Sequence, residues 1–176
     1  IMSACKYLFL ANNFSKLDDF LSEMKEQLDN NLSNKTWLSR YRLTVTQSVS
    51  EALSAFCKVV TTVMAMQTSD TTDFQSKYNA IPISDKQGRG RLVKAKFSMF
   101  NSGLNALLEN QGAWRVSSPP LREKLGRMLS EAVTPQYEAF HNEYHKSNFS
   151  KRHLDQYIKF SPDEVRMLLL RFWGAN

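Results

Sequence analysis

The stretch LREKLGRMLSEAVTPQYEAFHNEYHKSNFSKRHLDQYIKFSPDEVRMLLLRFW, from Leu121 to Trp173, decides the fold. Apolar residues recur every three or four positions in its first half, which indicates an amphipathic helix that begins near Ser118-Pro119. A capping box lies near its end, because Ser161 is followed by Pro162 and then by Glu164. The stretch therefore predicts two helices that are joined by a short, basic loop.

The same helical period recurs upstream. One apolar stripe consists of Tyr7, Leu10, Phe14, Leu17, Leu21, Met24 and Leu28, and a second of Leu38, Tyr41, Val45, Val49, Ala52, Phe56, Val60 and Val63. We interpret residues 1–66 as a long helical hairpin and residues 91–176 as the C-terminal helices. Residues 67–90 contain TSDTTD, a proline and two glycines, so we interpret them as a mobile loop. The chain is predicted to be all-α, either a bundle or the end of a helical rod.

The composition limits the class of protein. The 176 residues carry a net charge of +6 with a pI near 9.4, which favours anionic partners without selecting one. No apolar run approaches the roughly 18–20 residues that a membrane span requires. Cys5 and Cys57 form no disulfide framework or metal spacing, so a reducing, cytosolic setting is expected. Because the sequence opens on Ile1, inside a periodic helix and with no signal peptide before it, we interpret it as a fragment of a longer protein.

The residue pattern does not predict an enzyme. His141 and His145 stand four positions apart, a spacing that can bind zinc, but HNEYH lacks the HExxH order and a solvated helix face is preferred. Gly88-Arg89-Gly90 is too short for a phosphate-binding loop. We therefore predict no catalytic residue, no metal and no cofactor.

Two groups of cations are the candidate binding residues. The N-terminal basic cluster consists of Lys86, Arg89, Arg91, Lys94 and Lys96, and the C-terminal basic cluster of Lys146, Lys151, Arg152 and Lys159. Each cation near an anionic membrane contributes about 1 kcal/mol, so four of them predict weak, salt-sensitive attachment. Nucleic acid is disfavoured, because the aromatic residues lie on the apolar stripes and no nucleic-acid-binding motif is present. A merely solvated basic surface remains an alternative.

Several short motifs, taken together, resemble a known family. They are Tyr7-Leu8-Phe9-Leu10-Ala11-Asn12-Asn13, Phe97-Ser98-Met99-Phe100-Asn101, Gln111-Gly112-Ala113-Trp114, Leu121-Arg122-Glu123-Lys124-Leu125-Gly126-Arg127 and Tyr157-Ile158-Lys159-Phe160. In their order and spacing they resemble the C-terminal region of the 70-kDa subunit of the exocyst, the complex that tethers secretory vesicles to the plasma membrane. The resemblance spans about Tyr7 to Phe172.

The resemblance implies a fold and a function. It implies an antiparallel helical bundle at the C-terminal end of an elongated rod, without catalysis, in a cytoplasmic protein peripheral at the plasma membrane. It also implies binding to other exocyst subunits, to small GTPases and, through basic residues, to phosphatidylinositol 4,5-bisphosphate. Lys159 matches the second lysine of the family's E-K-Y-I-K-Y signature, whereas Gln156 replaces the first. Lys151 and Arg152 flank the same loop and compensate in this interpretation.

A second hypothesis belongs to another class of function. The family has divergent members in some lineages, some of them linked to defence or bound by pathogen proteins, and the substituted lysine suits such a member. The chain would then be a protein-recognition scaffold that binds a helix or peptide. An exposed apolar patch of several hundred Å² and little lipid binding would distinguish it from a tethering protein.

Overall fold

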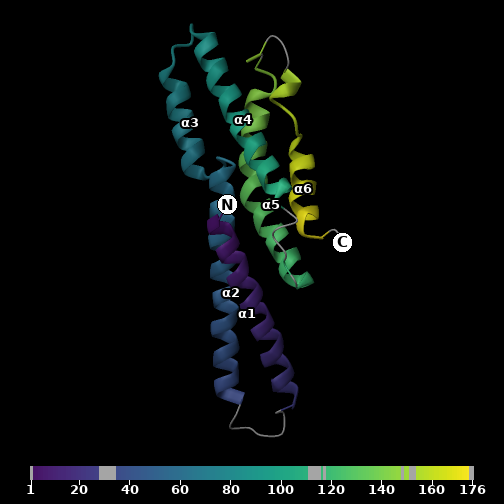
Figure 1. Ribbon diagram of the computed structural model, residues 1–176. Helices are drawn as coiled ribbons and strands as arrows, with labels where there is room; N and C mark the ends of the chain where they lie inside the picture. The colour runs from purple at the N-terminus through teal and green to yellow at the C-terminus, as the bar shows by residue number, and fades with distance from the viewer. Residues whose placement is uncertain are drawn as a thin grey trace.

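The computed structural model describes residues 2–27, 35–110, 116, 118–147, 149–150 and 154–174. Within these ranges the chain forms six α-helices and one 3₁₀ helix, and no strand (Figure 1). The elements are α1 (Met2–Gln27), α2 (Lys35–Val63), α3 (Thr68–Ala80), α4 (Lys86–Glu109), α5 (Pro119–Tyr144), η3 (Leu154–Gln156) and α6 (Pro162–Gly174). The predicted all-α bundle is confirmed.

The helices form an elongated arrangement with two different ends (Figure 1). α1 packs along α2, and this hairpin extends away from the other helices. The C-terminal part of α2 contacts α4 and α5, while α6 packs against α5. The α3–α4 turn and the described parts of the connection between α5 and α6 lie at the end opposite the outer turns of α1 and α2. Within the described helices, none is long and apolar enough to cross a bilayer.

The core lies where α2, α4, α5 and α6 meet. Its largest fully buried side chains are Tyr137, Phe56, Phe97, Phe100, Leu53, Met64, Met66, Leu104, Leu125, Leu129, Leu169 and Val93. The outer part of the hairpin has only a small separate cluster of Leu21 and Val45, against which Phe14 packs. Leu17 and Tyr41, which the apolar stripes assigned to the buried face, are exposed. The apolar stripes predicted the helices correctly. They did not predict which side chains of the outer turns are buried, because α1 packs only against α2 there.

The predicted mobile loop at residues 67–90 is wrong. The segment instead contains the whole of α3, a short turn and the first turns of α4. The hydroxyl-rich stretch starts a helix, because the Asp70 carboxylate accepts a hydrogen bond from the Gln67 backbone N–H at 3.0 Å. Phe74 and Tyr78 lie one turn apart and stack with their ring centres 5.9 Å apart, so α3 has its own apolar face. The interpretation of this segment relied on its composition and therefore missed both signals of a helix.

The end of α2 is a Schellman turn that has alanine where glycine is usual. The Met66 N–H bonds the Thr61 carbonyl and the Ala65 N–H bonds the Thr62 carbonyl, both at 3.0 Å. Ala65 has φ +53°, in the left-handed region. The Lys96 ammonium donates to the Ala65 carbonyl and closes the turn from α4. α2 and α4 are therefore joined at this point through one lysine side chain.

Ala65→Gly is expected to raise the free energy of unfolding by about 0.5–1 kcal/mol. Left-handed backbone costs an L-residue about 1–2 kcal/mol, which glycine avoids while losing part of the gain to a more flexible unfolded chain. Urea unfolding followed by circular dichroism measures the change. The matched control is Ala95→Gly, at an exposed position within α4, which is expected to lower stability by about 0.5–1 kcal/mol. If both variants changed the free energy of unfolding in the same direction, the left-handed backbone conformation of Ala65 would be contradicted.

Candidate functional site

The structure places the predicted cations unequally. Lys146 and Lys159 are described and exposed, whereas Lys151 and Arg152 lie outside the described residues. In the N-terminal basic cluster, Lys86 and Arg91 are exposed, and Arg89 and Lys94 are partly buried. The assignment of the fifth member, Lys96, to a surface patch is wrong, as its side chain is buried.

The position of Lys96 has a physical explanation. Its ammonium donates to the Ala65 carbonyl and lies 6.0 Å from the centre of the Phe74 ring. Burial lowers the pKa of Lys96, and the charges of Asp70 and Asp73 oppose this shift. A lysine is rarely buried without such partners. Lys96 therefore contributes to the joint between α2 and α4 and is not available to a ligand.

The connection between α5 and α6 is held against α4 by aromatic contacts. The Phe149 ring stacks on Phe97 with ring centres 5.5 Å apart, and Tyr157 meets Phe149 edge-on at 6.3 Å. The connection also approaches α4 closely at Gly90, where an added Cβ would lie 2.8 Å from the Phe149 carbonyl oxygen. Glycine at this position lets the backbone of the connection lie directly on α4.

The segment Tyr157–Phe160 is fixed by two side chains from different helices. Asn101 of α4 donates from Nδ2 to the Tyr157 carbonyl at 2.8 Å. Tyr137 of α5 donates from its hydroxyl to the Phe160 carbonyl at 2.6 Å. Lys159 lies between these two fixed points and is exposed. Its backbone position is therefore set by the core, while its ammonium can reach an external ligand.

One cation of the N-terminal basic cluster contacts the segment that carries Lys159. The Lys94 ammonium lies 5.4 Å from the centre of the Tyr157 ring, in a cation–π contact. Tyr157 stands two residues before Lys159 in the sequence, so Lys94 contacts the segment that carries Lys159. We call Lys94, Lys146 and Lys159 the basic surface. The sequence showed two separate clusters, and the contact of Lys94 with Tyr157 depends on how the connection folds back onto α4.

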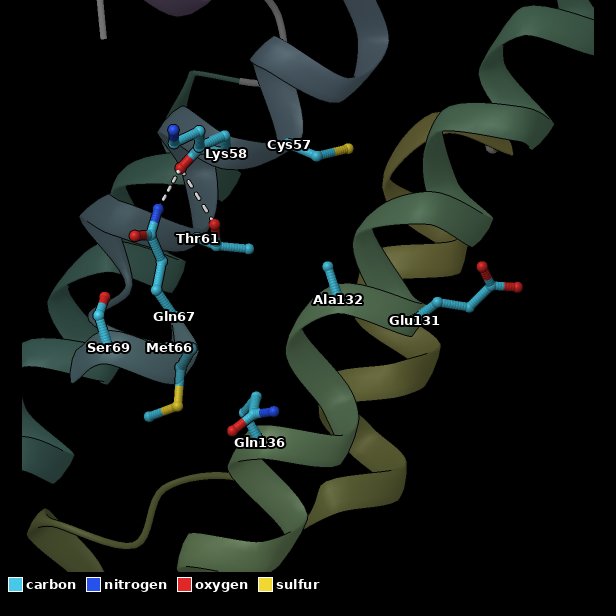
Figure 2. A pocket seen from close by; sticks show the side chains of 9 residues that line it. All are labelled: Cys57, Lys58, Thr61, Met66, Gln67, Ser69, Glu131, Ala132 and Gln136. Carbon is cyan, nitrogen blue, oxygen red and sulfur yellow. Dashed lines mark hydrogen bonds between the residues drawn. The ribbon is translucent and has the colours of Figure 1, made fainter. Parts of the chain in front are cut away.

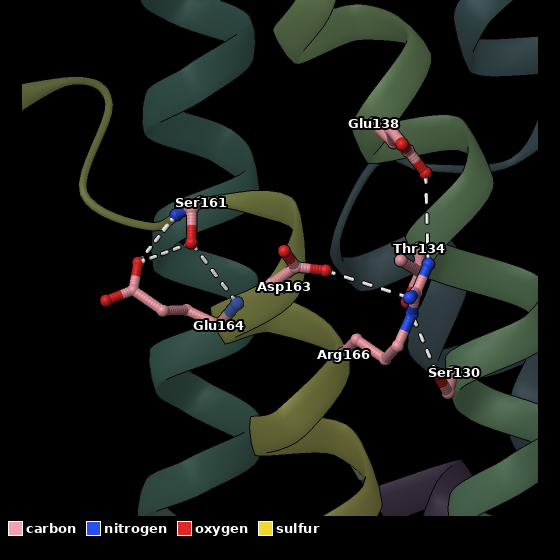
Figure 3. Close-up of polar contacts among 7 residues, drawn as sticks. All are labelled: Ser130, Thr134, Glu138, Ser161, Asp163, Glu164 and Arg166. Carbon is pink, nitrogen blue, oxygen red and sulfur yellow. Dashed lines mark hydrogen bonds and ion pairs between the residues drawn. The ribbon is translucent and has the colours of Figure 1, made fainter.

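The start of α6 fixes the other end of the connection (Figure 3). The Ser161 backbone N–H donates to the Glu164 carboxylate at 2.7 Å, and the Glu164 N–H donates to the Ser161 hydroxyl oxygen at 3.2 Å. The predicted capping box is thus confirmed. Hydrogen bonds from the Ser161 N–H and hydroxyl lower the pKa of Glu164. Arg166 then links α6 to α5, through Glu138 at 3.9 Å, and also pairs with Asp163 at 3.7 Å.

His141 of α5 and His145, the C-cap residue of that helix, face each other as stacked rings. The ring centres of His141 and His145 are 4.9 Å apart, and the His145 Nδ1 atom lies 3.0 Å from the His141 carbonyl oxygen. Burial is the main cause that lowers the pKa of His141. No group of three or more potential metal ligands occurs in the parts of the chain that the structure describes. The ring geometry suits packing at the end of α5.

A concave region of the structure was not predicted from the sequence. It is an open groove of about 590 Å³ between α2, the start of α3 and α5 (Figure 2). Its lining residues are Cys57, Lys58, Thr61, Met66, Gln67, Ser69, Glu131, Ala132 and Gln136. The groove arises at the α2–α3 turn, where the sequence interpretation had continued the helical hairpin to residue 66.

The groove carries little of the chemistry that catalysis requires. Burial raises the pKa of the Cys57 thiol to about 12, so it is not a thiolate nucleophile at neutral pH. The Gln67 amide turns back onto α2 and bonds the Lys58 carbonyl at 3.0 Å. Glu131 points away from the α2 side chains (Figure 2). Among the lining residues, no pair of groups forms a nucleophile and base.

Comparison with known proteins gives a consistent result. The family model for the C-terminal part of the Exo70 subunit of the exocyst complex matches residues 2–171. Exocyst complex component EXO70A1 of Arabidopsis thaliana is 25% identical over 94% of this chain and 25% of its own length. EXO70A3 of the same plant is 35% identical over 53% of the chain and 16% of its own length, and human exocyst complex component 7 is 23% identical over 98% and 22%. No solved structure matches the chain.

The match extends along nearly the whole chain, although the chain spans only about a quarter of the length of these relatives. The identities of 23–35% are those of a divergent member. The resemblance found in the motifs is therefore confirmed: the chain belongs to the Exo70 family of exocyst proteins and corresponds to the family's C-terminal region.

Proposed function

We propose that the chain is the membrane-contacting part of a non-enzymatic exocyst subunit that tethers secretory vesicles during exocytosis. The basic surface binds anionic lipid at the cytoplasmic face of the plasma membrane, with phosphatidylinositol 4,5-bisphosphate as the preferred headgroup. The observation that carries this proposal is the contact of Lys94 with Tyr157, two residues from exposed Lys159. Lys151 and Arg152, outside the described residues, belong to the same connection and are proposed to add to this surface.

The geometry supports attachment by several weak contacts. The hydrogen bonds from Asn101 and Tyr137 hold the backbone on both sides of Lys159 before any ligand binds. Less conformational entropy is then lost on binding than for cations on an unrestrained loop. Several phosphates on one headgroup can bridge several such cations, which sharpens the preference for polyphosphorylated lipids.

The protein partners are proposals as well. Relatives named as exocyst components imply that other exocyst subunits bind the longer protein to which such a chain belongs, and small GTPases are further candidates. The exposed apolar side chains of the α1–α2 hairpin, which include Phe9, Phe20 and Leu43, are available for protein contacts. No nucleic acid is among the proposed partners.

A protein-recognition scaffold is the second candidate function. The observation that favours it is the groove between α2, α3 and α5, whose open polar and apolar lining suits a peptide or helix from another protein. In this alternative the chain is a divergent, defence-related member, and the occupant of the groove is a regulatory or pathogen protein. Such a chain would still bind its partner after the basic surface is neutralised.

Neutralising Lys94 and Lys159 together is expected to weaken binding to anionic vesicles about thirtyfold. Two cations at about 1 kcal/mol each account for about 2 kcal/mol, and about 1.36 kcal/mol corresponds to a factor of ten. The measurement is co-flotation of wild type and Lys94→Gln/Lys159→Gln with neutral, phosphatidylserine and phosphatidylinositol 4,5-bisphosphate vesicles. Each set is repeated at low and at physiological salt.

The control variant carries the same charge change on the α1–α2 hairpin. Lys16→Gln/Arg40→Gln removes two exposed cations from α1 and α2 and is expected to change vesicle binding less than about threefold. Equal losses in both variants would show that only net charge matters. Wild-type binding that disappears at physiological salt, or lacks any lipid preference, would contradict the proposal and favour the scaffold.

A further inference from the structure

A separate cavity lies beside the turn between α3 and α4. It has a volume of about 310 Å³ and lies between α3, the start of α4 and the first described residues after α5. Pockets that hold small ligands span about 300–1,000 Å³, so this cavity is at the lower limit of that range. It has room for one side chain of a partner protein and not for a folded element. We call it the α3–α4 cavity.

The floor of the α3–α4 cavity is apolar. Val93 of α4 lines it and is 1% exposed. The Phe149 side chain also lines it and stacks on Phe97, which belongs to the fully buried core. The side chains of Val93 and Phe149 offer no hydrogen-bond donor or acceptor, so a polar group at this depth would lose its bonds to water without replacement. An apolar side chain would instead gain from burial there.

The rim of the cavity is cationic. Lys86 and Arg89 line it, Lys86 is exposed, and no carboxylate is among the described lining residues. The nearest acid in sequence, Asp85, caps α4 and accepts a hydrogen bond from the Gly88 N–H at 2.8 Å. That carboxylate is thus engaged at the helix end. The rim therefore attracts carboxylates, while the floor favours an apolar group.

Arg89 is already oriented for a carboxylate. Its Nε and Nη2 atoms donate to the Ile81 carbonyl at 3.0 and 2.8 Å, and its guanidinium lies 4.8 Å from the centre of the Tyr78 ring. The N–H groups on Nη1 take no part in the contact with Ile81. One side of the guanidinium is therefore held by the turn while the other can bond an anion, with little entropy lost on binding.

The entrance of the cavity adds an exposed apolar side chain. Ile83 lines the cavity from the α3–α4 turn and is 79% exposed. A side chain that enters the cavity would pass along Ile83 and remove part of its apolar surface from water. A buried apolar anchor surrounded by charged groups is the usual arrangement at the centre of a protein–protein contact.

We propose that the α3–α4 cavity is a protein-docking site, which binds an acidic segment of another protein through one inserted apolar side chain. The inserted side chain packs on Val93 and Phe149, and the carboxylates that flank it pair with Lys86 and Arg89. Charge complementarity identifies the partner, because the described lining offers two cations and no acid. The site shares no residue with the basic surface or with the groove between α2, α3 and α5, and it does not depend on the proposed membrane function.

The test uses a short acidic peptide in solution. The probe is acetyl-EDEFDE-amide, and its matched control, acetyl-EDESDE-amide, has the same charge but lacks the aromatic side chain. Each peptide is titrated into the full 176-residue chain at physiological salt, and amide chemical shifts are followed by nuclear magnetic resonance. We expect the phenylalanine peptide to give saturable shifts at Gly90, Val93 and Ser147. It should bind at least about tenfold more tightly than the serine peptide, because only it buries a large apolar side chain.

Two exposed positions test the rim without disturbing the core. Lys86→Glu is expected to weaken binding of the phenylalanine peptide at least about fivefold, because it replaces an attraction with a repulsion. Ile83→Ser is expected to weaken it about threefold through loss of apolar contact. The matched control, Arg91→Glu, makes the same charge change at an exposed residue of α4 outside the lining and should alter the affinity less than about twofold. Circular dichroism checks that each variant is folded.

Three results would overturn the docking site. Equal affinity for the two peptides, or equal losses in Lys86→Glu and Arg91→Glu, would show that net charge alone attracts the peptide. Wild-type affinity in both Lys86→Glu and Ile83→Ser would place the peptide elsewhere. Saturation of the same amides by inorganic phosphate but not by the phenylalanine peptide would make the cavity a site for small anions.

Failure of the docking site is distinguishable from failure of the proposed membrane function. The peptide titrations contain no lipid, and neither Lys94 nor Lys159 lines the α3–α4 cavity. Lys94→Gln/Lys159→Gln is therefore expected to bind the phenylalanine peptide within about twofold of wild type, whatever its binding to vesicles. A loss of peptide binding in that variant as large as in Lys86→Glu would contradict the assignment of the peptide to the cavity.

Discussion

Replacing Gly103 with alanine is expected to lower the free energy of unfolding by about 2 kcal/mol. A Cβ at this position of α4 would lie 2.6 Å from the Val63 carbonyl oxygen and 2.7 Å from the Met64 Cα atom. Both are backbone atoms at the end of α2, so no side-chain rotation can relieve the overlap. Overpacking of this kind costs about 1–3 kcal/mol, which exceeds the gain of up to about 1 kcal/mol from alanine's helix propensity.

Gly126→Ala is the matched control. Gly126 is also buried within a helix, but an added Cβ there would lie 3.4 Å from the nearest atoms, the Leu169 and Leu170 carbonyl oxygens. The helix propensity gain then dominates, and stability is expected to change between zero and about +1 kcal/mol. Chemical denaturation of both variants gives the comparison. A Gly103→Ala protein as stable as wild type would mean that α2 and α4 do not approach each other this closely.

Tyr137→Ala is expected to cost about 3–5 kcal/mol, the range for removing a large buried aromatic side chain. Tyr137 is fully buried and stacks on Phe100 with ring centres 4.1 Å apart. Tyr137→Phe keeps this packing and removes only the hydroxyl that binds the Phe160 carbonyl, so its expected cost is about 1 kcal/mol. Urea unfolding measures both values, with the exposed Tyr41→Ala expected to cost less than about 1 kcal/mol.

Tyr137→Phe also tests the link between the core and the basic surface. This variant lacks the hydrogen bond from the Tyr137 hydroxyl to the Phe160 carbonyl. The backbone around Lys159 then keeps only one of the two contacts that fix it. Vesicle binding should weaken about two- to threefold while the protein stays folded, because more conformational entropy is then lost on binding. Unchanged vesicle binding in a folded Tyr137→Phe protein would show that the fixed backbone does not contribute.

Local patterns allowed much of the fold to be predicted from the sequence. The capping box of Ser161 and Glu164 and the start of α5 at Pro119 depend on residues a few positions apart, and both were placed correctly. α3 was missed because its hydroxyl-rich first turn has the composition of a loop, while the signals for a helix were Asp70 after Gln67 and the Phe74–Tyr78 spacing. Most helices were therefore predictable from local patterns, whereas the composition of residues 67–90 led to the prediction of a loop in place of α3.

The candidate site was less predictable because it depends on contacts between distant residues. The contact of Lys94 with Tyr157 spans most of the C-terminal half of the chain, and no periodicity indicates it. Lys96 appeared equivalent to its basic neighbours until the Ala65 carbonyl was found beside it. Asn101 belongs to a motif recognised in the sequence, but its role in holding Tyr157 becomes visible only in the folded chain.

The continuity of α2 has a mechanical consequence. α2 is one helix of 29 residues, about 43 Å long at about 1.5 Å per residue, and only its C-terminal part enters the main core. Its other part is supported by α1, with the Arg42–Asp18 ion pair at 3.1 Å across the hairpin. The hairpin therefore projects from the core, to which α2 is joined by its contacts with α5 and with α4, the latter at Gly103 and Lys96. A force on the outer turns of α1 or α2 would therefore reach the core through these contacts.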